Sequence, residues 1–196
     1  VALDLGKKWL WLLDQDDEFH IQSTGVYQAT IGENPKESIF APIIYNKQSI
    51  VSPFRIRFGG GWQLQNINPG IHPLSQYLLI NTGLFISVDA FQEAGGYENE
   101  FPLDFSDLDF VHRLRKKYQQ FVVVSTSVHH SFSINIPLSR EKRLIRYQTY
   151  LKAARLFRKK YPRAIPSILF RSFLMSVKLS MRHYSLQFIK EFMKTT

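Results

Sequence analysis

Three carboxylates fall within four residues of the sequence, directly after a short apolar run. The acidic segment Asp14-Gln15-Asp16-Asp17 follows the residues KWLWLL of Lys8–Leu13. Such a run is typical of a buried strand, so we expect the acids at a strand end. Neighbouring carboxylates repel one another, and a bound cation relieves that repulsion. Oxygen ligands suit Mg²⁺ or Mn²⁺, which predicts a divalent-cation site. The alternative is a solvated acidic turn, with Asp17 capping the next helix.

A second group of acids lies in LDFSDLDFVHRLRKK, at Asp104, Asp107 and Asp109. Apolar residues at helical spacing and a cationic end predict a helix over 106–117, which places Asp107 and Asp109 in its first turn. Negative charge is favourable there for the helix dipole alone. A carboxylate that faces a pocket and an acceptor hydroxyl would instead serve as a general base.

Two adjacent histidines, His129 and His130, follow the β-branched run FVVVSTSV of Phe121–Val128. That run predicts a strand. An imidazole at a strand end can ligate a metal whose other ligands come from a neighbouring strand end. A purely structural histidine pair is the alternative.

The rest of the first 137 residues alternates between strand and helix patterns. Further strands are predicted over 39–45 and 77–88, the latter interrupted at Asn81-Thr82-Gly83, and helices over 18–32 and 88–94, the second closed by Gly95-Gly96. The glycine- and proline-rich stretch 52–73 predicts a hairpin or a long loop. This alternation indicates an α/β domain.

Charge divides the chain unevenly. The net charge of the 196 residues is +9, but residues 1–137 hold 10 Lys/Arg against 14 Asp/Glu, whereas residues 138–196 hold 15 against two. A length of 196 residues suits one sizeable core, and the absence of cysteine excludes disulfides and thiolate metal sites. The opening, which has no initiator Met and no signal peptide, reads like the interior of a domain, so we expect a segment upstream.

The basic part after Pro137 is predicted to be helical. A helical wheel places five apolar side chains on one side and three cations on a neighbouring face: Phe170, Leu174, Val177, Met181 and Phe188, and Arg171, Lys178 and Arg182. Such a helix can lie on an anionic membrane face. The alternative is packing on the catalytic domain with a solvated basic face. No uninterrupted run of about 18 apolar residues predicts a spanning helix.

Taken in order, these segments resemble family 2 glycosyltransferases with the GT-A fold, and within them the bacterial rhamnosyltransferase-like subgroup. The matching pieces are WLWLLDQDDEF, LLINTGLFISVDAFQEAGGYENEF, PLDFSDLDFVHRLRKKYQQFVVV, HHS and RYQTYLKAARLFRKKYP, within residues 1–162. The resemblance implies a GT-A (Rossmann-like) mixed sheet flanked by helices over 1–137. A basic amphipathic helical extension follows over 138–196.

The resemblance also implies roles for individual residues. On the donor side, Asp14 matches an acid near the ribose and Asp16 the acid that binds Mg²⁺ or Mn²⁺, while Asn81, Thr82 and Gly83 match a segment that lines the sugar site. His129 matches a histidine near the metal and diphosphate, although His130 also fits that place. On the acceptor side, Asp107 matches the catalytic base, and Gly95, Gly96 and Tyr97 match the loop before it, with Asp109 in the same region.

The implied protein is an inverting transferase that moves a sugar, rhamnose in that subgroup, from a nucleotide-diphosphate donor to a glycan or lipid-linked acceptor in cell-surface polysaccharide synthesis. It would act in the cytoplasm, peripherally at the inner face of the plasma membrane. Ser106 stands where many members have Glu, and the expected upstream segment would complete the nucleotide pocket. The alternatives are a basic nucleic-acid-binding protein, disfavoured because the charge avoids the α/β part, another Mg²⁺-dependent nucleotide-sugar enzyme, and a metal-dependent hydrolase.

Overall fold

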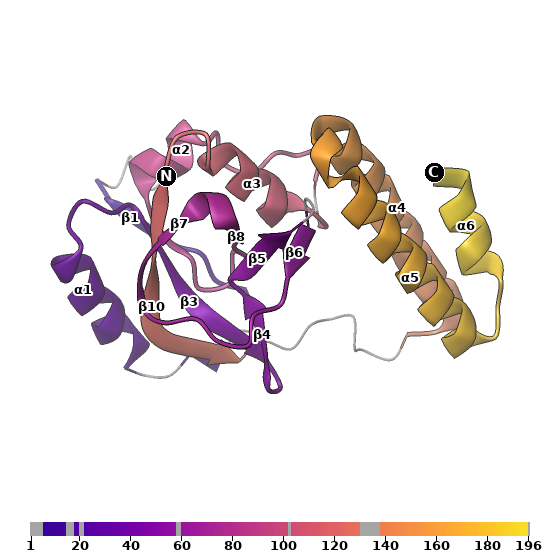
Figure 1. Ribbon diagram of the computed structural model, residues 1–196, viewed down its shortest axis with the longest axis horizontal. Helices are drawn as coiled ribbons and strands as arrows, with labels where there is room; N and C mark the ends of the chain where they lie inside the picture. The colour runs from indigo at the N-terminus through magenta and orange to yellow at the C-terminus, as the bar shows by residue number, and fades with distance from the viewer. Residues whose placement is uncertain are drawn as a thin grey trace. The chain divides into compact units, whose positions relative to one another are not determined.

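A computed structural model describes residues 6–14, 18–19, 22–57, 60–101, 103–129 and 138–195. The chain divides into two compact units, each described here by itself (Figure 1). Unit 1 comprises Val1–Ile56, Gly61–Glu98 and Asp107–Ile134, and unit 2 comprises Arg57–Gly60, Asn99–Ser106 and Asn135–Thr196. The second unit therefore takes two short segments from the first 137 residues.

The main sheet of unit 1 is mixed. Its described strands lie in the order β1 (Trp9–Trp11), β9 (Phe85–Ser87), β3 (Ile39–Asn46), β10 (Gln120–His129) and β2 (Glu18–Phe19). β3 and β10 are parallel, whereas the pairs β1–β9, β9–β3 and β10–β2 are antiparallel. The sheet has two further antiparallel strands, β4 (Ser49–Ser52) beside β3 and β7 (Gly70–Pro73) beside β10.

The stretch predicted as a hairpin or long loop contains more regular structure than expected. Besides β7, it holds β5 (Phe54–Arg57) and β6 (Gly60–Trp62), which form a small sheet with β8 (Tyr77–Leu78) in the order β6-β5-β8. The short helix η1 (Leu74–Gln76) precedes β8. Strands of three or four residues are too short to show a clear alternation in sequence, so tertiary pairing decided them.

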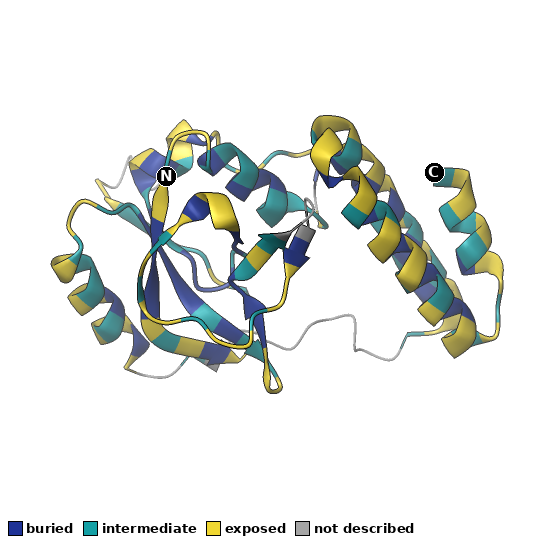
Figure 2. Cartoon of the chain, in the orientation of Figure 1, coloured by how far each residue is buried: buried dark blue, intermediate teal, exposed yellow. Residues whose placement is uncertain are grey.

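In the described part of unit 1, three α-helices accompany the main sheet, α1 (Ser23–Glu33), α2 (Val88–Glu93) and α3 (Ser106–Leu114). The helix predicted from residue 18 is wrong at its start, because Glu18 and Phe19 pair with the end of β10 as strand β2. Figure 2 shows buried residues, in dark blue, along the central strands β3 and β10. The core packs β3, β9 and β10 against the two later helices through Ile39, Ile86, Phe110, Leu114 and Phe121.

Unit 2 is built on helices. They are α4 (Arg140–Lys160), the short η3 (Pro162–Ala164), α5 (Ile165–His183) and α6 (Gln187–Thr195). Their core contains Tyr147, Leu151, Leu179 and Phe188. The predicted position of Phe188 is wrong: α5 ends at His183, with Tyr184 left-handed at φ 48°, so Phe188 belongs to α6 and is fully buried.

The α/β class predicted from the alternating patterns is confirmed, with a mixed sheet and flanking helices. The prediction about membrane spans needs one addition. Within the described chain, Pro162–His183 is long and apolar enough by length and composition to cross a membrane. Core helices of other proteins meet the same criteria of length and composition. The environment of this helix must therefore be inferred from which of its side chains are buried and which are exposed.

Candidate functional site

The carboxyl ends of three strands of unit 1 point to the same edge of the main sheet. β1 and β3 each run antiparallel to β9, so they share a direction, and β10 runs parallel to β3. Asp14 follows β1, and His129 is the last residue of β10. In the register of β2, Glu18 lies opposite His129. Asp14 and Glu18, the described residues on either side of positions 15–17, therefore both lie at this edge.

The Asn81-Thr82-Gly83 turn holds Asp14. The fully buried Thr82 donates its hydroxyl to Asp14 Oδ2 at 2.8 Å. The amide of Leu84 closes the turn on the carbonyl of Asn81 at 2.9 Å, and the amide of Gly83 donates to the carbonyl of Leu12 at 2.8 Å. A hydrogen bond to a charged carboxylate is stronger than a neutral one. Of the five residues predicted for the donor side, the structure thus brings the Asn81-Thr82-Gly83 turn against Asp14.

Only glycine fits at position 83. Its φ of +71° lies in the left-handed region, and a Cβ there would come within 2.7 Å of Pro42 Cγ. The buried Tyr27 of α1 donates its hydroxyl to the Gly83 carbonyl at 2.6 Å. Burial raises the pKa of Tyr27 above its ordinary value, which keeps the phenol a donor. The turn is therefore fixed from the strand side and from the helix side.

The Gly95-Gly96 pair ends α2 in a Schellman motif. The amide of Gly95 donates to Gln92 O at 2.8 Å, and that of Gly96 to Phe91 O at 3.0 Å. Both glycines have positive φ, +80° and +59°. This is the double hydrogen bond of a helix that ends in left-handed residues. The predicted helix end is confirmed, and the chain leaves it directly into Tyr97.

An arginine of α3 holds this glycine loop in place. Arg113 donates to the carbonyls of Ala94 and Gly96, the latter at 2.6 Å, and pairs with Glu98 at 3.4 Å. Its Nε also pairs with Asp109 Oδ2 at 2.9 Å. Asp109 is fully buried. The residue predicted for the acceptor side thus lies beneath the loop, where it orients Arg113.

Tyr97 connects the two acidic groups of unit 1. Its ring packs on Phe91 and Phe110, with centroids 5.8 and 5.0 Å apart. Burial of the ring raises the pKa of Tyr97 above its ordinary value, and the negative charges of Asp107 and Asp14 raise it further. Both carboxylates therefore lie within electrostatic reach of the same phenol. Asp14 and Asp107, which are far apart in sequence, thus both act on the phenol of Tyr97.

His112 of α3 shows a large electrostatic perturbation. Burial, together with the positive charges of Arg115 and Lys116, lowers its pKa to about 4, although Asp109 opposes that shift. The imidazole is therefore neutral near pH 7. The cations that complement the dipole at the end of α3 thus also disfavour a charge on His112.

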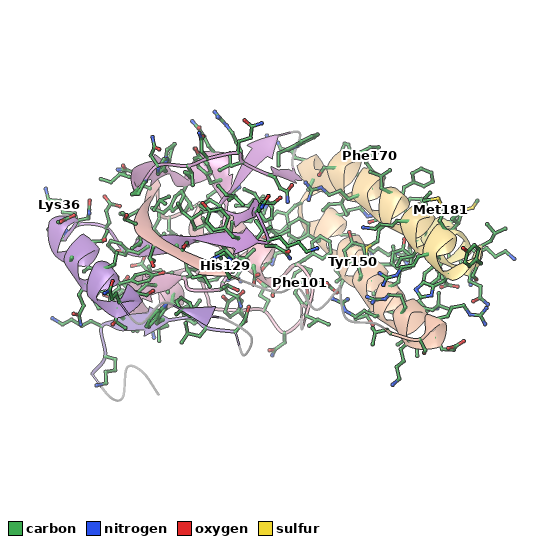
Figure 3. All side chains as sticks on the ribbon, turned by 90° about the horizontal axis from the view of Figure 1, so that it is seen from below. Lys36, Phe101, His129, Tyr150, Phe170 and Met181 are labelled. Carbon is green, nitrogen blue, oxygen red and sulfur yellow. The ribbon has the colours of Figure 1, made fainter. Side chains whose placement is uncertain are left out.

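The predicted metal ligands are only partly described. Asp16 and His130 lie outside the described residues, whereas His129 lies at the carboxyl edge (Figure 3), with its ring 6.0 Å from that of Tyr45 on β3. Among the described residues, no group of three His, Cys, Asp or Glu side chains could hold a metal ion. A carboxylate and an imidazole at one edge suit a divalent cation in chemistry.

Two residues that hold the site together, Arg113 and Tyr27, were not predicted from the sequence to do so. The Asp109–Arg113 pair has the i, i+4 spacing of a helical ion pair, which was a usable signal. Tyr27 gave no such signal in the sequence, because its partner is 56 residues away.

The sequence matches no known protein-family model, and comparison with curated proteins found no match.

Proposed function

We propose that unit 1 is the catalytic core of an inverting glycosyltransferase that moves a sugar from a nucleotide-diphosphate donor to an acceptor hydroxyl. One observation carries the proposal: the Thr82–Asp14 hydrogen bond fixes an acid at the carboxyl edge of the sheet, and Tyr97 lies within electrostatic reach of both that acid and Asp107. In open α/β sheets, ligands bind outside the carboxyl ends of the strands. A donor at this edge would have one acid beside it and another facing the acceptor.

In the proposed reaction, Asp107 takes the proton of the acceptor hydroxyl. The hydroxyl oxygen attacks the anomeric carbon as the bond from that carbon to the diphosphate oxygen breaks, which inverts the configuration. A general base of this kind contributes roughly 10²–10⁴-fold to the rate. The first turn of α3 suits Asp107, because the helix dipole favours the ionised form that a base requires.

The remaining residues position the reactants. Thr82 would orient Asp14 toward the donor's ribose, and the Gly95–Tyr97 loop, held by Arg113, would line the acceptor side. Asp16 and His129 are the proposed ligands of Mg²⁺ or Mn²⁺. Such an ion would offset the charge that grows on the leaving diphosphate.

Calorimetric titration of dTDP, UDP and GDP into the chain tests the donor site. Binding of one nucleotide with Mn²⁺, lost with EDTA, would support the proposal and name the donor class. Thr82→Val should weaken that binding about 10-fold or more, because the hydrogen bond to a charged acid is worth about 1.5–3 kcal/mol. Thr30→Val, which removes a hydroxyl bonded within α1, is the matched control and should bind as before.

The base is tested separately from the donor site. Asp107→Asn should lower release of the nucleotide diphosphate from the sugar donor about 10²–10⁴-fold and leave donor binding nearly intact. Asp89→Asn changes an exposed acid in the first turn of α2 and controls for the helix dipole. Equal rates for Asp107→Asn and the native chain would remove Asp107 from the mechanism. Binding of duplex DNA without any nucleotide binding would favour the nucleic-acid alternative.

A further inference from the structure

The outer side of α5 is apolar and its inner side is lined with serine. Among the buried residues of this helix are Ser172, Ser176 and Ser180, while Phe170 and Met181 are 61% and 66% exposed. Figure 3 shows Phe170 and Met181 on the side of α5 away from Tyr150 of α4. The inner side also buries Ile168 and Leu179, but large apolar side chains exposed on the outer side are not expected of an ordinary amphipathic helix in water.

The serine side is fixed in the interior of unit 2 by specific contacts. Tyr147 of α4 donates its hydroxyl to the carbonyl of Ser172 at 2.9 Å. The hydroxyl of Ser176 donates to the carbonyl of Phe173, one turn back, at 2.7 Å. Small side chains that satisfy their own hydroxyls let helices approach closely. Turning the phenylalanines inward would break the hydrogen bond from Tyr147 to Ser172 and would remove Leu179 from the core of unit 2.

The exposed side chains form one continuous stripe. Ile165, at the start of α5, is exposed but lies on another side of the helix. At about 100° per residue, the other large apolar side chains that are exposed fall within one sector. They are Phe170, Phe173, Leu174 and Met181. Beyond the end of the helix, Tyr184 and Leu186 are also exposed. A contiguous apolar stripe of this kind marks an interaction surface.

Positive charge borders the stripe. Arg171, Lys178 and Arg182 occupy the adjoining sector of α5, which contains no acidic residue. On the other side of the helix, at Ile165 and Leu169, a pocket of about 350 Å³ is lined by further cations, Arg155, Arg158 and Lys159 of α4 and Lys194 of α6. Lys194 pairs with Glu191 at 2.6 Å. The apolar stripe thus lies between two groups of cations. This arrangement is complementary to a partner that has an apolar interior and anionic groups at its surface.

We propose that the stripe Phe170, Phe173, Leu174 and Met181 binds the surface of an anionic membrane, with α5 lying in the plane of the interface. The apolar side chains enter the boundary between headgroups and acyl chains, and Arg171, Lys178 and Arg182 contact lipid phosphates. A spanning orientation is disfavoured, because it would carry these three cations into the hydrocarbon. The serine side also already packs within unit 2. This surface is independent of the proposed catalysis.

Vesicle sedimentation of the full chain tests the proposal. We expect the protein to pellet with vesicles of phosphatidylcholine and phosphatidylglycerol, and weakly with phosphatidylcholine alone. The triple variant Phe170→Ser, Leu174→Ser, Met181→Ser should lower the partition coefficient more than tenfold. Its matched control, Leu13→Ser, Ile71→Ser, Leu103→Ser, removes three exposed aliphatic side chains elsewhere and should bind as the native chain does.

The charges are tested in the same assay. Arg171→Gln, Lys178→Gln, Arg182→Gln should lower binding to the anionic vesicles about a hundredfold at low salt, since each cation near such a surface contributes about fivefold. The control Lys36→Gln, Lys47→Gln, Lys117→Gln removes three exposed lysines of unit 1. Equal binding to neutral and anionic vesicles would overturn the assignment of an anionic surface.

A fluorescent label reports whether the stripe itself enters the membrane. The chain has no cysteine, so Leu174→Cys provides a single thiol for an environment-sensitive dye, and Ile71→Cys is the control. We expect a blue shift on anionic vesicles from position 174 alone. A blue shift without vesicles that rises with protein concentration would show that a second copy covers the stripe, and the proposal would fail. Protein that resists alkaline extraction from membranes would indicate a spanning helix and would also overturn it.

Discussion

Helices α3 and α5 each bury both apolar and polar residues, but of the two only α5 leaves large apolar side chains exposed. α3 places Phe110, Val111 and Leu114 in the core of unit 1, and the one acid that it buries, Asp109, is paired with Arg113. α5 buries serines and exposes its phenylalanines. In α3 the environment is water on one side and protein on the other. In α5 the exposed apolar side is the surface that we propose enters a membrane.

This difference shows that an amphipathic pattern in the sequence distinguishes two sides of a helix but does not determine which side is buried. Burial follows where close contacts and satisfied polar groups can be made. The Asp109 carboxylate tolerates burial because a cation lies 2.9 Å away, and the serines of α5 tolerate it because they are small and some bond to their own helix.

The largest expected effect on stability comes from breaking the buried pair of α3. Arg113→Met leaves Asp109 without this cation and frees two carbonyls of the glycine loop, so it should destabilise the fold by about 3–5 kcal/mol. Chemical denaturation followed by circular dichroism measures this change. Lys116→Met, an exposed substitution on the same segment, should stay within about 0.5 kcal/mol.

A double-mutant cycle sharpens this result. Adding Asp109→Leu to Arg113→Met removes the buried carboxylate as well, so the double variant should be less destabilised than the sum of the two single variants. Additive effects would mean that the ion pair does not couple the two side chains, and that Arg113 acts only through the loop carbonyls.

The lowered pKa of His112 predicts that the free energy of unfolding depends on pH. The expected change is similar to or smaller than that of Arg113→Met. Its pKa is about 4 in the folded chain and about 6.5 when unfolded, so the unfolded chain binds more protons between these values. The contribution of His112 is therefore fully present above pH 6.5 and is lost as the pH falls toward 4, by at most about 3 kcal/mol. His112→Gln should remove this part of the loss in denaturation curves measured from pH 7 to pH 4. An unchanged difference between the two proteins across that range would contradict the shift.

The smallest effects compare the two sides of α5 directly. Ser176→Leu inserts two extra heavy atoms into a fully buried position and should destabilise unit 2 by about 1–3 kcal/mol. Phe170→Ser, on the exposed side, should change stability in water by no more than about 0.5 kcal/mol. Thermal unfolding of both variants measures this contrast. A larger loss for Phe170→Ser would show that its ring is needed for folding, which would leave less of the stripe for membrane contact.

Local sequence patterns determined much of the secondary structure. The apolar run at β1, the β-branched run at β10 and the Gly95-Gly96 end of α2 were all predicted, because each depends on side-chain periodicity or on residues that permit left-handed backbone. The uneven charge and the helical character of the last third were equally visible. The predicted transferase site was read from motif order, and that prediction stays to be tested.

Only the tertiary structure decided which distant groups meet. The hydrogen bonds of Thr82 to Asp14 and of Tyr27 to Gly83 join residues 68 and 56 positions apart, beyond any local rule. The pairing of β2 with β10 overrode a helical pattern at Glu18, and a left-handed Tyr184 separated Phe188 from α5. The same holds for the buried side of α5. Its wheel was visible in the sequence, but only the packing of Ser172, Ser176 and Leu179 in unit 2 decided which side of the helix is buried.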